Sequence, residues 1–177
     1  MVFSKNKRAQ AAIEFLMTYG WMLLVVLIVG ALIFSFVDFG SLLPNKVDLS
    51  NNLRASATES VASAKSSTVT VVFGYNGAKA ASINISQAKL DADLGGSCPA
   101  VTLRNIDLKT NVTDTSGIDS LTFLNGHDGV IAFNCSALQP PMIVDDVIEG
   151  KIVIPVTNAK TGISVPSKGT LRLQITD

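Results

Sequence analysis

One uninterrupted apolar stretch near the N-terminus constrains this chain more than any other feature. No charged residue and no proline occurs from Phe15 to Val37. At about 1.5 Å of rise per residue, a helix over this stretch is roughly 35 Å long, enough to cross about 30 Å of hydrocarbon. A helix also satisfies its own backbone hydrogen bonds, as a lipid environment requires. We therefore predict a hydrophobic helix, which we place over residues 10–40.

The charges beside this stretch predict its orientation in a membrane. Lys5, Lys7 and Arg8 precede it, and Asp38 follows it. Because basic flanking segments stay in the cytoplasm, we expect the N-terminus inside and the rest of the chain outside. A secretory signal fits poorly, since its apolar region is only about 7–15 residues long and a small-residue cleavage site follows it. Here the small residue beside the basic cluster, Ala9, precedes the apolar stretch.

Glu14 is the only charged residue between Ala9 and Asp38. A carboxylate costs free energy in lipid, although less near the interface than at the centre. Two structural explanations exist: Glu14 lies at headgroup depth, or it occupies the first helical turn, where the macrodipole favours a negative charge by about 0.3–1 kcal/mol. On its own, the residue does not decide between a structural and a functional role.

The order of these features resembles the class III signal of archaeal type IV-like pilins, and more specifically the adhesive-pilin branch. The resemblance covers residues 5–40: basic residues, Ala9, the sequence QAAIEFLMTYGW and then the apolar helix. It implies that a prepilin peptidase removes residues 1–9 by cutting between Ala9 and Gln10. Glu14 would then neutralise the free amino terminus of a neighbouring subunit. Opposite charges attract strongly in a low-dielectric filament core, and either charge alone is costly there.

The same resemblance implies a set of partners and a location. A precursor in the cytoplasmic membrane would be extracted by an assembly ATPase and a membrane platform protein. Its copies would then form a helical homo-oligomer, a surface filament that serves adhesion. The alternative is an uncleaved, monomeric single-pass anchor that displays an extracellular β-domain for binding a ligand.

Strand signals recur at short spacing in the rest of the chain. β-branched and aromatic residues alternate with polar ones, and the segments end at turn sequences such as Asn76-Gly77. We expect strands over residues 68–75, 80–86, 100–108, 120–124, 130–135, 151–157 and 170–176. Short strands with no helical period between them predict an antiparallel β-sandwich of immunoglobulin-like type over residues 68–177. With the helix, the fold class is α+β.

Residues 41–67 are predicted to be a linker between the helix and this domain. Pro44 discourages continuation of the helix, and Ala, Ser and Asn dominate the following residues. We expect an extended tether there, with a short amphipathic helix as the alternative.

Cys98 and Cys135 are the only cysteines. In an extracellular domain they would form one disulfide, which adds roughly 3–4 kcal/mol of stability by closing the loop between them. The alternative is two small buried thiols. The sequence argues against a zinc site, because two thiols and one distant histidine fall short of four ligands.

Three sequons for N-glycosylation begin at Asn84, Asn111 and Asn134. Asn111 is the best candidate, because polar, turn-prone residues flank it. Asn134 is the weakest, because a disulfide at the adjacent Cys135 would block access.

Other functional classes have little support in the sequence. The chain has 14 basic and 14 acidic residues and no basic stripe, which argues against a nucleic-acid partner. His127 is the only histidine and is expected in a hairpin turn. Asp145, Asp146 and Glu149 lack the spacing of a calcium loop, and no nucleotide-binding motif occurs. We therefore expect no catalysis, no cofactor and no metal.

Overall fold

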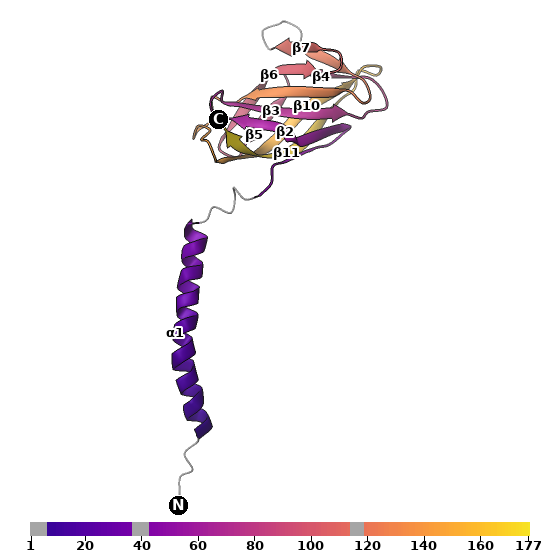
Figure 1. Ribbon diagram of the computed structural model, residues 1–177. Helices are drawn as coiled ribbons and strands as arrows, with labels where there is room; N and C mark the ends of the chain where they lie inside the picture. Colours follow the sequence, from indigo (N-terminus) through magenta and orange to yellow (C-terminus); the bar gives the residue numbers. More distant parts are fainter. Residues whose placement is uncertain (1–6, 37–42, 114–118) are drawn as a thin grey trace, which may run out of the picture. The chain divides into compact units, whose positions relative to one another are not determined.

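The computed structural model describes residues 7–36, 43–113 and 119–177 and divides the chain into two compact units (Figure 1). The first unit is Met1–Leu42, and the second, Leu43–Asp177, is a β-domain that we call the head. Residues 1–6 of the predicted leader and 37–40 of the predicted helix lie outside the described residues.

A 30-residue α-helix, α1 (Lys7–Phe36), forms the described part of the first unit. By length and composition, its segment Ile13–Ile33 is able to cross a membrane. The predicted hydrophobic helix is therefore present. It starts earlier than we expected, at Lys7, because nothing in the basic residues or in Ala9 breaks a helix.

The described residues of the head form eleven strands. They are β1 (Lys46–Leu49), β2 (Leu53–Ser63), β3 (Thr68–Tyr75), β4 (Ala81–Asn84), β5 (Lys89–Ala92), β6 (Gly96–Asn105), β7 (Thr110–Thr113), β8 (Ser120–Phe123), β9 (Asp128–Asn134), β10 (Val147–Asn158) and β11 (Ser164–Thr176). The predicted β-rich domain is confirmed.

Part of this sheet closes into a barrel. The strands pair in the order β11-β2-β3-β9-β6-β5-β10, and β10 pairs with β11 to complete the ring. β1 pairs with β11, β7 with β6, and β4 joins β8 to β10. The prediction of an immunoglobulin-like sandwich is therefore wrong.

The head closes into a barrel because β11 is long. Its thirteen residues pair with β10 along one edge and with β1 and then β2 along the other. The contact with β2 is parallel, through Ile175 opposite Ala62 and Thr176 opposite Ser63, so the sheet is not purely antiparallel either. A single strand that hydrogen-bonds on both edges joins what would otherwise be two sheets.

The predicted linker is also wrong over most of its length, because β1 and β2 lie within it. Leu53 and Ala62 of β2 are buried in the head core. The register of β2 against β3 shifts between Ser56 and Val61, and the buried Ser60 stabilises this irregularity. Its Oγ donates to the Ser56 carbonyl oxygen at 2.6 Å and accepts from the Val72 amide at 3.1 Å.

The core of the head comes from alternating side chains that point into the barrel. In β3, Val69, Val71, Phe73 and Tyr75 are buried, whereas the residues between them are partly exposed. Phe73 packs against Phe123 with ring centroids 5.5 Å apart. This two-residue period is the one that the sequence shows.

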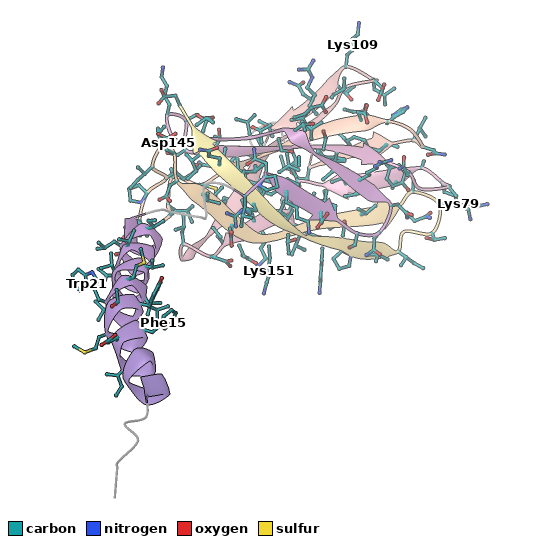
Figure 2. The ribbon with its side chains drawn as sticks, turned by 60° about the horizontal axis from the view of Figure 1, so that its bottom comes forward. Phe15, Trp21, Lys79, Lys109, Asp145 and Lys151 are labelled. Carbon is teal, nitrogen blue, oxygen red and sulfur yellow. A yellow bond between two sulfur atoms is a disulfide. The ribbon has the colours of Figure 1, made fainter. Side chains whose placement is uncertain are left out.

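The strand directions define two ends of the head. The chain enters at the end that we call the base, where the Gln174 amide donates to Asn45 Oδ1 at 2.9 Å. The opposite end, which we call the tip, contains the turns that follow β1, β3, β6, β8 and β10. Figure 2 shows Asp145 at the base and Lys79 at the tip.

Candidate assembly helix and head surface

From Phe15 onward, the surface of α1 carries no charge and is apolar on every side. Consecutive side chains such as Met22, Leu23 and Leu24 are exposed by 62%, 65% and 50% within the single chain. Successive helical residues point about 100° apart, so an unbroken apolar run leaves no polar face. Figure 2 shows Phe15 and Trp21 projecting from the same helix. A helix of this kind needs lipid or other apolar surfaces around it.

Glu14 lies within this helix and is exposed in the single chain. The first turn of α1 contains no acidic residue, so the interpretation of Glu14 as a first-turn charge is wrong for the uncleaved chain. The rings of Phe15 and Tyr19 stack beside it, with centroids 4.1 Å apart. Among the residues whose side chains the structure describes, no ion pair involves Glu14.

Ala9 and Gln10 are the third and fourth residues of α1. The first four amide groups of a helix have no acceptor within it. The bond between Ala9 and Gln10 is therefore in the part of the helix that unwinds at the lowest cost.

Gly20 and Gly30 leave two open positions on the helix surface. A Cβ added at either residue meets no atom within 4 Å in the single chain. Small residues of this kind allow neighbouring helices to approach closely.

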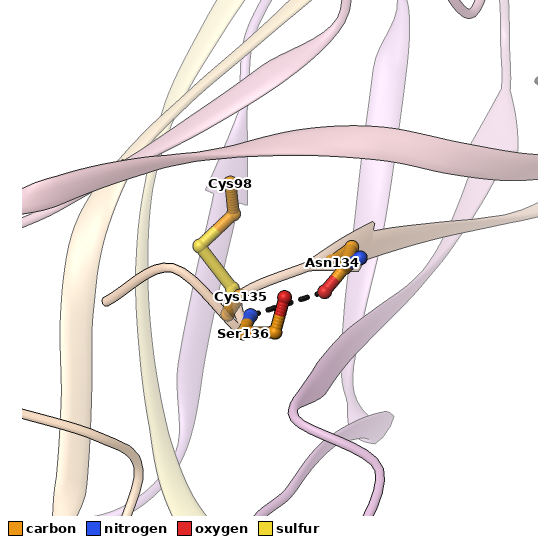
Figure 3. Close-up of a disulfide and its surroundings, with 4 residues drawn as sticks. All are labelled: Cys98, Asn134, Cys135 and Ser136. Atoms are coloured by element: carbon orange, nitrogen blue, oxygen red, sulfur yellow. Dashed lines mark hydrogen bonds between the residues drawn. A yellow bond between two sulfur atoms is a disulfide. The ribbon is translucent and has the colours of Figure 1, made fainter.

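Cys98 in β6 and Cys135, which follows β9, form a disulfide, as predicted (Figure 3). Their Cα atoms are 4.6 Å apart, and the residues are 0% and 2% exposed. Since β6 and β9 are paired neighbours, the disulfide reinforces a contact that the sheet already makes.

Two of the three sequon asparagines are half-buried and hydrogen-bonded within their own sequon. Asn84 Oδ1 accepts from the Ser86 amide at 2.9 Å and from Ser86 Oγ at 2.7 Å. Asn134 Oδ1 accepts from the Ser136 amide at 3.0 Å, beside the buried disulfide (Figure 3). Asn111 differs, because it is exposed on β7.

The acidic residues at the base make local contacts. Glu149 accepts a hydrogen bond from Arg172, and Asp146 Oδ1 accepts from the Val147 amide at 3.2 Å.

In β5, the Lys89 ammonium holds the pKa of Asp91 below its usual value, with help from Ser97. Across the described residues, no three His, Cys, Asp or Glu side chains gather where they would hold a metal ion.

Sequence reasoning missed Asn105, which is fully buried. Its Nδ2 donates to the Thr122 carbonyl oxygen at 3.0 Å and lies 3.2 Å from Nδ1 of His127. Its Oδ1 accepts from the Leu108 amide at 3.1 Å. His127 follows the turn after β8, but this turn is not the predicted hairpin, because β8 pairs with β4 whereas β9 pairs with β3 and β6. The contact of His127 with Asn105 had no signal in the sequence.

Comparison with known proteins gives little further information. No protein family matches this chain, and no curated protein is similar to it. Among solved structures, it is similar to the CooA pilin subunit from enterotoxigenic Escherichia coli, with a TM-score of 0.33 and 14% sequence identity. The match covers 74% of this chain and 99% of that chain. A likeness this low carries no argument about fold or function, so the proposal below depends on the residues of the chain itself.

Proposed function

We propose that this chain is the precursor of an archaeal type IV-like pilin, a filament subunit that assembles through α1 and displays its head for adhesion. The observation that carries the proposal is the composition of α1. It is apolar on every side, contains the carboxylate of Glu14, and belongs to a unit separate from the head.

Lipid satisfies the apolar surface of α1 but does not satisfy Glu14. A buried carboxylate requires a positive partner, and breaking such a pair costs about 3–5 kcal/mol. A neighbouring copy that begins at Gln10 would supply its free amino group. Apolar burial alone favours assembly weakly, because lipid is already apolar. The ion pair, close packing at Gly20 and Gly30, and energy from the assembly ATPase would therefore drive the helix out of the membrane.

The closed ring of strands in the head supports assembly through the helix. Some surface filaments assemble when one subunit donates a strand to an incomplete sheet of the next. Here β10 and β11 pair with each other and complete the ring among the described residues, which leaves no break between these two strands for a donated strand. The helix is the segment that still has a large uncovered apolar surface.

Removal of the leader would also improve the electrostatics of α1. Lys7 and Arg8 stand in its first turn, where the helix macrodipole disfavours positive charge. Cutting between Ala9 and Gln10 removes both residues and brings Glu14 within two turns of the new N-terminus. Prepilin peptidase is the proposed enzyme, and a membrane platform protein the proposed site of assembly.

The alternative function is a monomeric, uncleaved anchor whose head binds a ligand. The apolar helix fits this alternative equally well. Glu14 favours the filament, because a permanent anchor needs no carboxylate in its apolar helix, although headgroup depth would tolerate one there.

Mass spectrometry of the native protein separates these functions. We expect a mature chain that begins at Gln10, purified from surface filaments visible by electron microscopy. An intact Met1 terminus on a protein that stays in the membrane fraction would show that the chain is an anchor.

Substitution of Glu14 tests the assembly mechanism apart from processing. Glu14→Ala and Glu14→Gln should be cleaved normally, yet lose about 3–5 kcal/mol per subunit contact. At roughly tenfold per 1.4 kcal/mol, such a loss abolishes visible filaments. Thr18→Ala, one turn further along the helix, is the matched control and should assemble. Normal filaments from both Glu14 variants would remove the carboxylate from the mechanism.

A further inference from the structure

We propose that Asn111 is the glycosylated sequon of the head and that its glycan covers the free edge of the sheet at β7. The site assignment depends on the proposed function only in placing the head outside the cell, whereas the edge-covering role also depends on filament formation. The inference concerns one residue and one strand edge, and it excludes the other two sequons.

The position of Asn111 in β7 makes its amide available. Its neighbour Val112 is 2% exposed and lies opposite the fully buried Leu103 of β6. Because strand residues alternate between faces, Asn111 lies on the outer face. It is exposed, and no hydrogen bond occupies its side-chain amide among the contacts that the structure describes.

Asn84 and Asn134 are placed differently. Asn84 lies in β4, which has β10 on one side and β8 on the other. Asn134 ends β9 opposite Thr68 and precedes the buried Cys135. Both are half-buried, so a transferase that acts on the folded head has poor access to them.

The edge of β7 gives the glycan a role. β7 pairs with β6, and among the described residues no strand pairs with its other edge. An unpaired edge presents amide and carbonyl groups that another chain can extend into a mixed sheet. A bulky, hydrated glycan on the edge strand itself prevents that approach. The need is acute in a filament, where identical heads are held close together.

The modification is a group transfer from a lipid-phosphate-linked oligosaccharide. The bond between the anomeric carbon and the phosphate oxygen breaks, and a bond forms between that carbon and Asn111 Nδ2. The amide nitrogen loses one proton, and the lipid phosphate leaves with the bonding electrons. No oxidant or reductant is required.

Glycopeptide mapping of the native protein tests the site. We expect glycan mass on the peptide containing Asn111 and none on the peptides containing Asn84 and Asn134. An unmodified Asn111, or equal occupancy at all three sites, overturns the assignment. Glycan occupancy is measured in the same way whether or not the chain forms filaments. A negative result would therefore refute the glycosylation site without refuting the proposed function.

Variants at Thr113 test the role of the glycan in the producing organism. Thr113→Ala and Asn111→Gln each destroy the sequon, and each should increase lateral bundling of filaments seen by electron microscopy. Thr113→Ser preserves the sequon and should give single filaments, as the unaltered chain does. Thermal unfolding of each variant shows that the head is folded. Folded, unglycosylated variants that remain as single filaments would refute the edge-covering role.

Discussion

Asn105 connects three segments at the tip through one side chain. Both its amide hydrogens and its carbonyl oxygen are used, on Thr122, His127 and Leu108. The Leu108 amide can only donate and the Thr122 carbonyl can only accept, so these two contacts fix which way the Asn105 amide points. His127 Nδ1 must therefore accept. The sequence contains many asparagines, and nothing in the local pattern marks this one as buried.

Replacing Asn105 should destabilise the head strongly. Asn105→Ala removes the hydrogen bonds that this fully buried side chain makes to the Thr122 carbonyl, His127 and the Leu108 amide, which at about 1 kcal/mol each costs about 2–4 kcal/mol in total. Denaturant unfolding of the full chain in detergent, followed by near-ultraviolet circular dichroism, measures this loss. Asn111→Ala, an exposed asparagine in unglycosylated protein, is the control and should change stability by less than about 0.5 kcal/mol. Equal stabilities for the two variants would contradict the role of Asn105.

Among the secondary-structure elements, the alternation of apolar and polar residues predicted those strands whose inward-facing residues are large and apolar. The expected segment 68–75 coincides with β3, and 120–124 differs from β8 by one residue. β2 escaped prediction because its sequence is rich in Ala and Ser and its register shift breaks the two-residue period. It is a strand because its two ends, Leu53–Ser56 and Val61–Ser63, pair with β3, which is tertiary context and not propensity.

The turn between β6 and β7 contains a strained residue that can be improved. Lys109 has φ of 51°, a left-handed conformation that costs a residue with a Cβ about 1–2 kcal/mol. After allowance for the greater freedom of unfolded glycine, Lys109→Gly should stabilise the head by about 0.5–1 kcal/mol. Lys109→Ala keeps the Cβ and should leave stability nearly unchanged. Denaturant midpoints of both variants check this, and equal effects would show that side-chain charge matters more than backbone strain.

At the scale of the whole molecule, the sequence predicted a hydrophobic helix and a β-rich head but not how the head closes. Alternation of apolar and polar residues is equally compatible with a β-sandwich and a β-barrel. The choice depends on pairings between distant segments, such as β11 with β2, which no local pattern reveals. Of the candidate site residues, only the Cys98–Cys135 pair is settled by the structure, whereas the roles of Ala9, Gln10, Glu14 and Asn111 depend on processing, neighbouring copies and modification.

The disulfide should contribute much of the stability of the head. A Cys98→Ala, Cys135→Ala double variant should lose about 2–5 kcal/mol relative to the unaltered chain. Because both cysteines are buried, a reductant should act only after the head unfolds. Denaturant midpoints with and without dithiothreitol should therefore differ for the unaltered chain and coincide for the double variant. If dithiothreitol left the denaturant midpoint of the unaltered chain unchanged, the disulfide would add nothing to the stability of the head.

The attachment of the chain at the base has a mechanical consequence. Force transmitted from the helix enters the head through β1, which pairs along its length with β11. When a load acts between base and tip, it runs parallel to these strands and strains all of their hydrogen bonds together. Such shear resists rupture far better than peeling, in which bonds break one after another. In the proposed adhesive filament, β1 would thus resist the unfolding of the head under a pulling force.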